Sequence, residues 1–349
     1  MKRNLLALTI LSAFAATAAA QSSVTLFGVV DLGVSNIKNG SAGTIQGLTP
    51  GAAATSRLGF RGIEDLGGGL KAGFHLEAGT QPDVGTVSAS KFWDRRSTVS
   101  LYGSWGELRL GHDYNPSSRN TYIFEPYVGT SVGSILNFTL ALPTAGLGSG
   151  VGVITLLRSD NTVAYYTPAG LGGFYGEAMV GAGEGVPGVK YVGGRIGYKA
   201  GQFDVSAGYG KTEAAGGNDF KQANVAGQWD FGVAKLQGLY NTHSFGQLKQ
   251  KTWSIGVKAP MGSGELLALY GANDRSGGAA GSGFGEADDS KLISVGYYHF
   301  LSKRTNLYGI AGRVTNDGAA KLSVGLSTPA AMLPGETSTG IQFGITHRF

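Results

Sequence analysis

Arginine side chains recur at strand-like spacing in the first half of this 349-residue chain and are the residues best suited to bind a ligand. They are Arg57, Arg61, Arg96, Arg109 and Arg158. A guanidinium group stays protonated at any relevant pH and offers a fork of donors to a carboxylate or phosphate. Gathered around a narrow aqueous passage, such groups raise the local concentration of anions. Their chemistry is therefore attraction of anions rather than the breaking of bonds.

A second interpretation pairs each of these arginines with a neighbouring acid. The available carboxylates are Asp31, Glu64, Glu77, Asp94, Glu107 and Asp160. Paired arginines would act mainly as cross-links between neighbouring strands. The sequence favours a lumen-lining role most for Arg57, Arg96 and Arg158, and leaves Arg61 and Arg109 evenly balanced between the two interpretations.

Other chemistry finds little support in the sequence. The chain has no cysteine, which excludes thiol catalysis and Cys-type zinc sites, and its five histidines show no paired metal spacing. No nucleophile stands beside a base in a recognisable pattern. Residues 183–188 read GEGVPG, but a strand-like segment follows where a dinucleotide site needs a helix. We therefore expect no enzyme activity, no cofactor and no bound metal.

Strand-like alternation extends to the last residue of the chain. In the final nine residues, Ile341, Phe343, Ile345 and Phe349 share one face of a strand, whereas Gln342 shares the other with a glycine, a threonine and an arginine. The same alternation begins near Val24 and recurs throughout the chain. A wall that is apolar on one face and polar on the other predicts a transmembrane β-barrel.

The amino terminus has a different composition. Lys2 and Arg3 precede a mostly apolar run, and Ala18 to Ala20 form a small-residue cleavage site, so residues 1–20 are interpreted as a secretory signal peptide and residues 21–349 as the barrel. Removing Lys2 and Arg3 from the 28 basic residues leaves 26 against 23 acidic ones, a net charge of +3. That excess is too small to indicate nucleic-acid binding. No later stretch reaches the ~18 consecutive apolar residues of a membrane helix.

Sixteen strand candidates can be placed, each long enough to cross a bilayer when tilted. They lie near residues 23–35, 55–64, 70–79, 93–103, 106–114, 158–167, 173–183, 189–199, 202–212, 220–231, 233–243, 250–259, 264–273, 290–301, 305–315 and 338–349. Short turns alternate with longer polar connections such as 36–54, 80–92, 274–289 and 316–337. This alternation is typical of an up-and-down barrel with short periplasmic turns and long outer loops.

One connection, residues 115–157, is longer than the others. It contains Tyr122, Phe124, Tyr127, Ile135 and Phe138, and is too apolar for a solvated tail. Loops of this length in a compact domain are usually functional or disordered. We therefore expect this loop to pack against the interior of the barrel.

Strand parity assigns the arginines to the polar face. Where Leu58, Val99, Leu108 and Val163 face lipid, the arginines at 57, 61, 96, 109 and 158 face inward. A lipid-facing arginine would cost about 2–4 kcal/mol near the bilayer midplane, which favours the same assignment. Arg95 has the opposite parity and is expected at a rim. Tyr102, Glu125 and Asp31 are further candidates for the passage.

Several segments resemble the Gram-negative general porins, particularly those of betaproteobacteria. They are SVTLFGVVD (23–31), SRLGFRGIEDLGGGL (56–70), RSTVSLYG (96–103), ELRLG (107–111), NTVAYYTP (161–168) and the terminal Phe349. The resemblance implies a sixteen-stranded antiparallel barrel, trimeric, in the outer membrane, whose third outer loop folds into the pore. It is strongest to the anion-selective porins, where inward arginines line the constriction; Arg57, Arg96 and Arg158 take those places.

The resemblance also sets expectations for partners and function. Residues 125–129 resemble the acidic turn of the constriction loop, which adds Glu125 to the pore-constriction set of Arg57, Arg96, Arg158, Arg61 and Arg109. The expected partners are two further copies of the chain in a homotrimer, outer-membrane lipid and lipopolysaccharide, and small anions and hydrophilic solutes. The function expected is passive diffusion with a preference for anions. The alternatives are a substrate-specific channel for organic acids or phosphate and a closed structural barrel.

Overall fold

Alternating residues build a β-sheet in the computed structural model, which describes residues 23–87, 91–139, 156–185, 189–213, 219–325 and 332–349. Within these ranges eighteen strands form one antiparallel sheet. The helices there are short, and none is long and apolar enough to cross a membrane. The predicted signal peptide, residues 1–20, lies outside the described residues.

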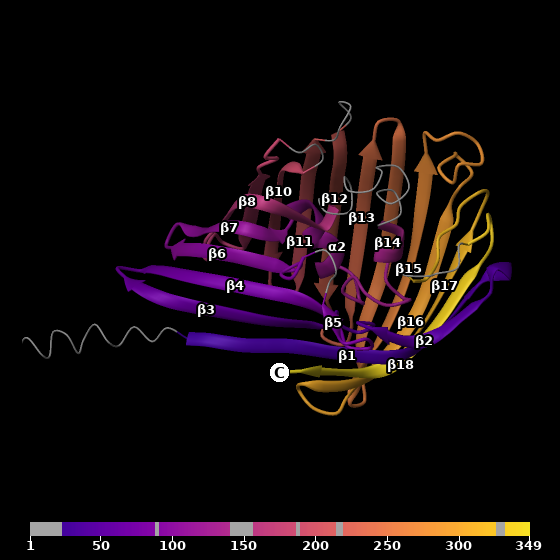
Figure 1. Ribbon diagram of the computed structural model, residues 1–349, viewed down its shortest axis with the longest axis horizontal. Helices are drawn as coiled ribbons and strands as arrows, with labels where there is room; N and C mark the ends of the chain where they lie inside the picture. The colour runs from indigo at the N-terminus through magenta and orange to yellow at the C-terminus, as the bar shows by residue number, and fades with distance from the viewer. Residues whose placement is uncertain (1–22, 88–90, 140–155, 186–188, 214–218, 326–331) are drawn as a thin grey trace, which may run out of the picture.

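The strands follow one another in chain order (Figure 1). They are β1 (Ser23–Asn39), β2 (Thr44–Pro50), β3 (Arg57–Gly67), β4 (Leu70–Gln81), β5 (Thr86–Val87), β6 (Arg96–Gly103), β7 (Gly106–Tyr114), β8 (Arg158–Tyr166), β9 (Phe174–Gly181), β10 (Lys190–Ala200), β11 (Phe203–Glu213), β12 (Asp219–Asp230), β13 (Lys235–Phe245), β14 (Leu248–Met261), β15 (Gly264–Ser276), β16 (Ser290–Phe300), β17 (Thr305–Asn316) and β18 (Ser338–Arg348). The described helices are η1 (Gly40–Ala42), α2 (Pro116–Ile123) and α3 (Leu136–Thr139).

The sheet closes on itself where the first and last strands meet. β1 pairs with β18 along one edge, from Val29 opposite Arg348 to Asn39 opposite Ser338. Gly28 and Phe349 complete this seam with two reciprocal backbone hydrogen bonds of 3.1 Å. Closure leaves no sheet edge exposed to lipid, which is the requirement for a β-structure that spans a bilayer.

The eighteen strands occupy sixteen positions around the barrel, because two of the barrel strands are each interrupted and divided into two shorter strands. β2 and β3 both pair with β1 along the same edge, one after the other, and together count as one interrupted barrel strand. β5 and β6 pair with β4 in the same way and form the second interrupted strand. The sixteen-stranded antiparallel barrel predicted from the sequence is confirmed. The predicted loops 36–54 and 80–92 are shorter than expected, because the adjoining strands continue into them.

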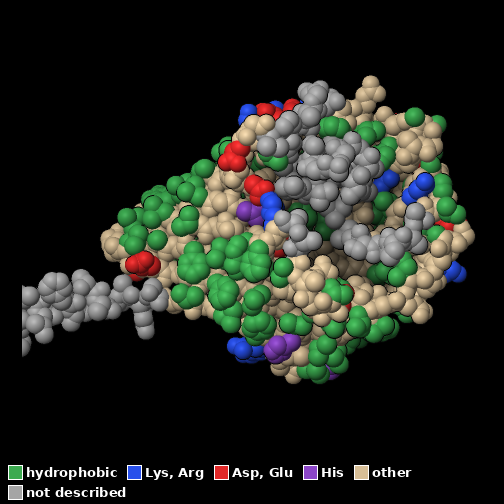
Figure 2. Space-filling model, viewed as in Figure 1, with side chains coloured by type: hydrophobic (Ala, Val, Ile, Leu, Met, Phe, Trp, Pro, Cys, Tyr) green, Lys and Arg blue, Asp and Glu red, His purple; other side chains and the backbone are tan. Residues whose placement is uncertain are grey.

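The two faces of the wall differ as the period-two pattern predicts. On β1, outward Val34 is 59% exposed, whereas inward Asp31 and Ser35 are 0% and 5% exposed. Figure 2 shows hydrophobic side chains spread over much of the outer wall. Both ends of the described chain lie at the end of the barrel with the short turns. Ser23 pairs with Ile63 near the short β3–β4 turn, and β18 runs antiparallel to β1 and ends beside it.

The long loop contributes its largest apolar side chains to the interior core. Its Phe124, Tyr127, Ile135 and Phe138 are at most 1% exposed and pack against inward apolar side chains of the wall such as Leu267. The loop's backbone is bonded to the same wall: Gln250 on β14 donates to the Phe138 carbonyl at 2.7 Å, and Ser294 on β16 donates to the Gly133 carbonyl at 2.9 Å. The expected packing of this loop inside the barrel is confirmed for residues 115–139; residues 140–155 lie outside the described chain.

Candidate functional site

The described residues of the loop, 115–139, contact one side of the lumen. Helix α2 contacts β9 to β13, where Ser117 Oγ lies 2.9 Å from the Tyr191 hydroxyl and Asn120 donates to Asn224 at 2.8 Å. The following residues lie against β14 to β18. The predicted arginines lie on strands outside this set, β3 and β6 to β8.

Glu125 holds the turn of this loop. Its carboxylate is 1% exposed and accepts hydrogen bonds from the Gly129 amide, from Ser134 Oγ at 2.8 Å and from the Ile135 amide at 3.2 Å. Gly129 has φ +77°, and a Cβ there would overlap the Tyr122 ring. Burial raises the pKa of Glu125 to about 7. The carboxylate points into the loop and not into the passage.

Arg57 and Arg95 share one carboxylate on β4. Glu77 Oε1 lies 2.5 Å from Arg95 Nε and 3.8 Å from Arg57 Nε, and its other oxygen lies 3.1 Å from His75 Nε2. The expectation that Arg95 sits at a rim is wrong: its side chain is 10% exposed and points inward. Arg95 lies in a bend just before β6, so strand parity does not apply to it.

Arg158 lies next to this pair without a carboxylate of its own. Its Nε donates to the Arg95 carbonyl at 2.9 Å, and its guanidinium carbon lies 3.9 Å from the centre of the Tyr114 ring. Asp160, the acid nearest in sequence, is bound instead by Lys91 and by His112 at 2.7 Å. Among the described residues no carboxylate comes within 4.0 Å of Arg158, so its charge is not neutralised by contact.

Arg96 and Arg109 share Asp113 near the end of β7. Arg109 also forms a bidentate pair with Glu107 at 2.8 and 2.9 Å and lies 4.0 Å from the centre of the Tyr166 ring. Arg96 is held less closely, with Nε 3.8 Å from Asp113. Arg109 is thus tied to two carboxylates, as the cross-linking interpretation expects, whereas Arg96 keeps a 22% exposed side chain.

A glycine bulge places Asp113 among these arginines. The β7–β8 register shifts between Gly111 and Asp113, and Gly111 has φ +126°, where a Cβ would overlap the Ser97 carbonyl. Only glycine adopts this conformation at little cost. The bulge turns both His112 and Asp113 toward partners inside the wall.

Arg61 lies nearer the short-turn end. Its guanidinium carbon is 5.1 Å from the centre of the Phe27 ring, and within the described chain it has no ion pair. A hollow of about 270 Å³ is lined by Arg61 together with Arg96, Arg109 and Tyr102. The structure thus brings three of the predicted arginines and Tyr102 to one cavity.

Asp31, in contrast, takes no part in the passage. It is 0% exposed and accepts from the amides of Ala52, Ala53 and Ala54 at 2.9, 3.1 and 3.0 Å. Asp31 therefore holds the segment 51–56, which separates β2 from β3. Thr130 of the long loop donates to the Gly51 carbonyl in that segment, which couples the segment to the loop.

Two further arginines were not singled out from the sequence. Arg195 on β10 donates to Asn120 Oδ1 at 2.6 Å and lies 3.3 Å from Glu177. Arg119 on α2 lies 2.9 Å from the other Glu177 oxygen, without an aligned hydrogen bond. The parity of Val192 and Ile196 would have assigned Arg195 inward. Arg119 lies in a loop, where no periodicity exists to find it.

The wall carries an excess of positive charge. Six arginines and Lys91 lie here against five carboxylates, a difference of two positive charges: the arginines are 57, 61, 95, 96, 109 and 158, and the acids are Glu77, Asp94, Glu107, Asp113 and Asp160. In a narrow polar lumen such an excess attracts anions. A closed barrel narrowed by its own internal loop beside such a wall defines a membrane channel.

Comparison with known proteins agrees with this geometry. The family model described as Gram-negative porin matches residues 7–319. The chain is 39% identical to outer membrane porin protein 32 of Delftia acidovorans over the full length of both. It is similar in structure to an anion-selective porin from Comamonas acidovorans, with 36% identity, a TM-score of 0.84, and coverage of 94% of this chain and 100% of that one. The trimer form of OmpT from Vibrio cholerae, at 15% identity and TM-score 0.66, with 94% and 99% coverage, shares the fold.

The chain belongs to the Gram-negative porin family. It is a porin of the outer membrane and a channel for passive diffusion. Proteins of this family are channels rather than enzymes.

Proposed function

We propose that the channel prefers anions and that the arginine wall is the cause. The observation that carries this proposal is the imbalance of charge on β3 to β8, above all at Arg158, which no described carboxylate approaches within 4.0 Å. The ion pairs of Arg57 and Arg96 are long, at 3.8 Å. The anion-selective porin that the chain resembles in structure supports the same conclusion.

The proposed selectivity acts through the field and not through tight binding. Arg57, Arg96 and Arg158 form the constriction facing the loop, with Arg61 and Arg109 beside them. Conduction requires that an ion leaves as readily as it enters, and partly shared guanidinium groups attract anions without holding them. Glu125 contributes indirectly, because it fixes the loop that narrows the passage.

The test is the zero-current potential of the purified protein in a planar bilayer between two KCl concentrations. A potential of the sign set by chloride supports the proposal. A potential of the sign set by potassium contradicts it.

A substrate-specific channel for organic acids or phosphate is the second candidate. It is favoured by the fork of donors that each guanidinium offers to such anions. A current that low concentrations of the anion block saturably would support this candidate, whereas a current that rises linearly with solute supports a general channel. A closed structural barrel would conduct nothing in the same bilayer.

The remaining proposals concern export and assembly. We infer that residues 1–20 are cleaved on export, that residues 21–349 form the mature barrel, and that three copies associate. The trimer form of the related fold supports the last inference. The mature barrel then lies among outer-membrane lipid and lipopolysaccharide and passes small anions and hydrophilic solutes.

A further inference from the structure

His112 on β7 lies between two oxygen acceptors within the arginine wall. Its Nδ1 lies 2.7 Å from Asp160 Oδ1 on β8, and its Nε2 lies 2.8 Å from the carbonyl oxygen of Asp94, in the segment before β6. The bulge that begins at Gly111 directs the ring toward both partners. The side chain of His112 is only 12% exposed, so the protein supplies the surroundings of both nitrogens.

These two partners determine the charge of the ring. A neutral imidazole has one N–H and one lone pair, whereas a carboxylate and a backbone carbonyl only accept hydrogen bonds. Asp160 is held as a carboxylate because Lys91 binds its other oxygen. A ring nitrogen without its proton would therefore direct a lone pair at an oxygen 2.7 or 2.8 Å away. The geometry requires both N–H groups, which make His112 an imidazolium cation.

The imidazolium occupies the carboxylate that would otherwise compete for Arg158. Asp160 follows Arg158 by two residues on the same strand, but its two oxygens are bound by His112 and Lys91. Arg158 Nε donates instead to the Arg95 carbonyl at 2.9 Å, which is the carbonyl next to the one that His112 binds. The two cations thus hold neighbouring carbonyls of one bend, and the charge of Arg158 is not neutralised by contact with Asp160.

The charge of His112 adds to a wall that is already positive. Protonated His112 raises the difference between six arginines with Lys91 and five carboxylates from two positive charges to three. The charged and titratable groups on the elements around it are His75 and Glu77 on β4, Lys91, Asp94 and Arg95 before β6, Arg96 on β6, Arg109 and Asp113 on β7, and Arg158 and Asp160 on β8. Histidine is the side chain that ordinarily changes its charge between about pH 5 and 8.

We propose that His112 is a selectivity-determining residue, which as an imidazolium neutralises Asp160, leaves Arg158 available to anions and makes the anion preference decline as pH rises. This inference rests on the proposed anion preference of the channel. Loss of the proton removes one positive charge from the wall and breaks one of the two ring contacts, because a lone pair replaces one donor. Asp160 then has one cation fewer beside it, so the field at Arg158 becomes less positive.

The test is the zero-current potential in a KCl gradient, measured between about pH 5 and pH 9 for the unchanged protein and two variants. His112→Lys keeps the positive charge over this range, and His112→Gln has none. At the acidic end the unchanged channel should match His112→Lys and exceed His112→Gln about twofold in its chloride-to-potassium permeability ratio. At the basic end it should match His112→Gln. His75 and Glu125 are present in all three proteins, so their titration does not affect the differences.

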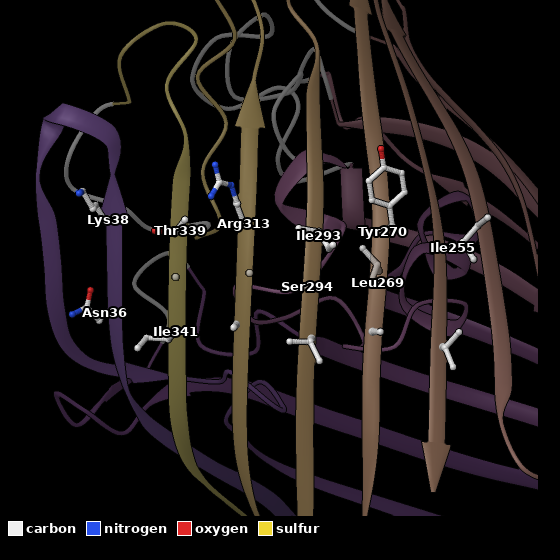
Figure 3. A pocket seen from close by; sticks show the side chains of 16 residues that line it. Asn36, Lys38, Ile255, Leu269, Tyr270, Ile293, Ser294, Arg313, Thr339 and Ile341 are labelled. Atoms are coloured by element: carbon white, nitrogen blue, oxygen red, sulfur yellow. The ribbon is translucent and has the colours of Figure 1, made fainter. Parts of the chain in front are cut away.

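The control places a titrating group on the other side of the wall. Arg313 and Lys38 line a depression on the outer face of the barrel (Figure 3), and Arg313→His introduces an imidazole there. This variant should reproduce the pH profile of the unchanged protein, because the wall separates its ring from the lumen.

The possible outcomes separate this inference from the proposed function. An anion-selective protein whose pH profile runs parallel to that of His112→Gln would overturn the role of His112 and leave the proposed function standing. A cation-selective unchanged protein at the acidic end would contradict the proposed function itself. If His112→Gln does not refold, the difference between the unchanged protein and His112→Lys decides, because it must grow as pH rises; a constant difference overturns the inference.

Discussion

Arg158 lies across the ring of Tyr114, with its guanidinium carbon 3.9 Å from the ring centre. Tyr114 is the last residue of β7 and Arg158 the first of β8, so the two residues mark where the long loop leaves the wall and returns to it. The aromatic face holds the guanidinium without neutralising its charge. Within the described chain, Arg158 is therefore a fixed cation without a carboxylate partner, and we propose that it lies at the constriction.

Replacing Arg158 should weaken the preference for anions. Arg158→Ala removes one unpaired charge from the passage and should shift the zero-current potential toward that of an unselective pore. Arg158→Lys keeps the charge and should retain most of the preference. Arg313→Ala is the matched control, because that charge lies on the outer wall. An equal shift in the Arg158→Ala and Arg313→Ala variants would contradict the assignment.

Replacing Arg109 should act mainly on stability. Its side chain is 10% exposed and holds Glu107 and Asp113, which Arg109→Ala would leave without their main partner. Breaking such a buried pair costs about 3–5 kcal/mol. Samples are heated to increasing temperatures, and the loss of the folded band is followed by gel electrophoresis. The unfolding temperature should fall clearly for Arg109→Ala and should fall less for Arg96→Ala, because the ion pair of Arg96 is longer. The reverse order would show that Arg109 is not the stronger cross-link.

The loop should be held more firmly in acid than in base. Burial raises the pKa of Glu125 from 4.5 to about 7, so the docked carboxyl keeps its proton over a range where a solvated one has lost it. The stability of docking is full below about 4.5 and declines as pH rises toward 7. Current fluctuations should therefore increase between pH 5 and pH 8. The Glu125→Ala channel should fluctuate strongly at both pH values; a quiet variant would rule out this role.

Asp31 should be needed to hold the segment between β2 and β3 in place. Asp31→Ala leaves the amides of Ala52, Ala53 and Ala54 without their acceptor, and each buried unsatisfied group costs about 1–3 kcal/mol. We expect the variant to refold poorly in detergent. Tyr308→Phe removes only one donor to the same carboxylate, at 2.9 Å, and should refold nearly normally. If both variants refold alike, Asp31 is not the anchor of this segment.

The period-two alternation of side chains was enough to predict the barrel, because the outer face of the wall contacts lipid and the inner face contacts a polar interior. Val34 and Asp31 show the contrast on one strand, and no tertiary knowledge is needed to assign them. The inward orientation of Arg57, Arg96 and Arg158 follows from the same rule. The interruptions of two barrel strands do not follow from this rule. In each of them the chain leaves the sheet and then rejoins it, so that β2 and β5 are separated from the rest of their barrel strand.

Parity fails wherever the backbone leaves the extended form. Arg95 points inward because a bend precedes β6, and Gly111 shifts the phase of β7 so that His112 and Asp113 both find partners inside. The loop has no period at all, so neither the position of Arg119 beside Glu177 nor the internal bonds of Glu125 could be predicted.

The most direct test of the arginine constriction compares zero-current potentials in a KCl gradient. The unchanged protein is measured beside a triple variant with Arg57→Ala, Arg96→Ala and Arg158→Ala, and beside the triple lysine variant as the charge-preserving control. We predict an anion-selective potential for the unchanged protein and for the lysine variant, and its collapse in the alanine variant. An alanine variant that keeps the anion-selective potential would contradict the role assigned to these arginines.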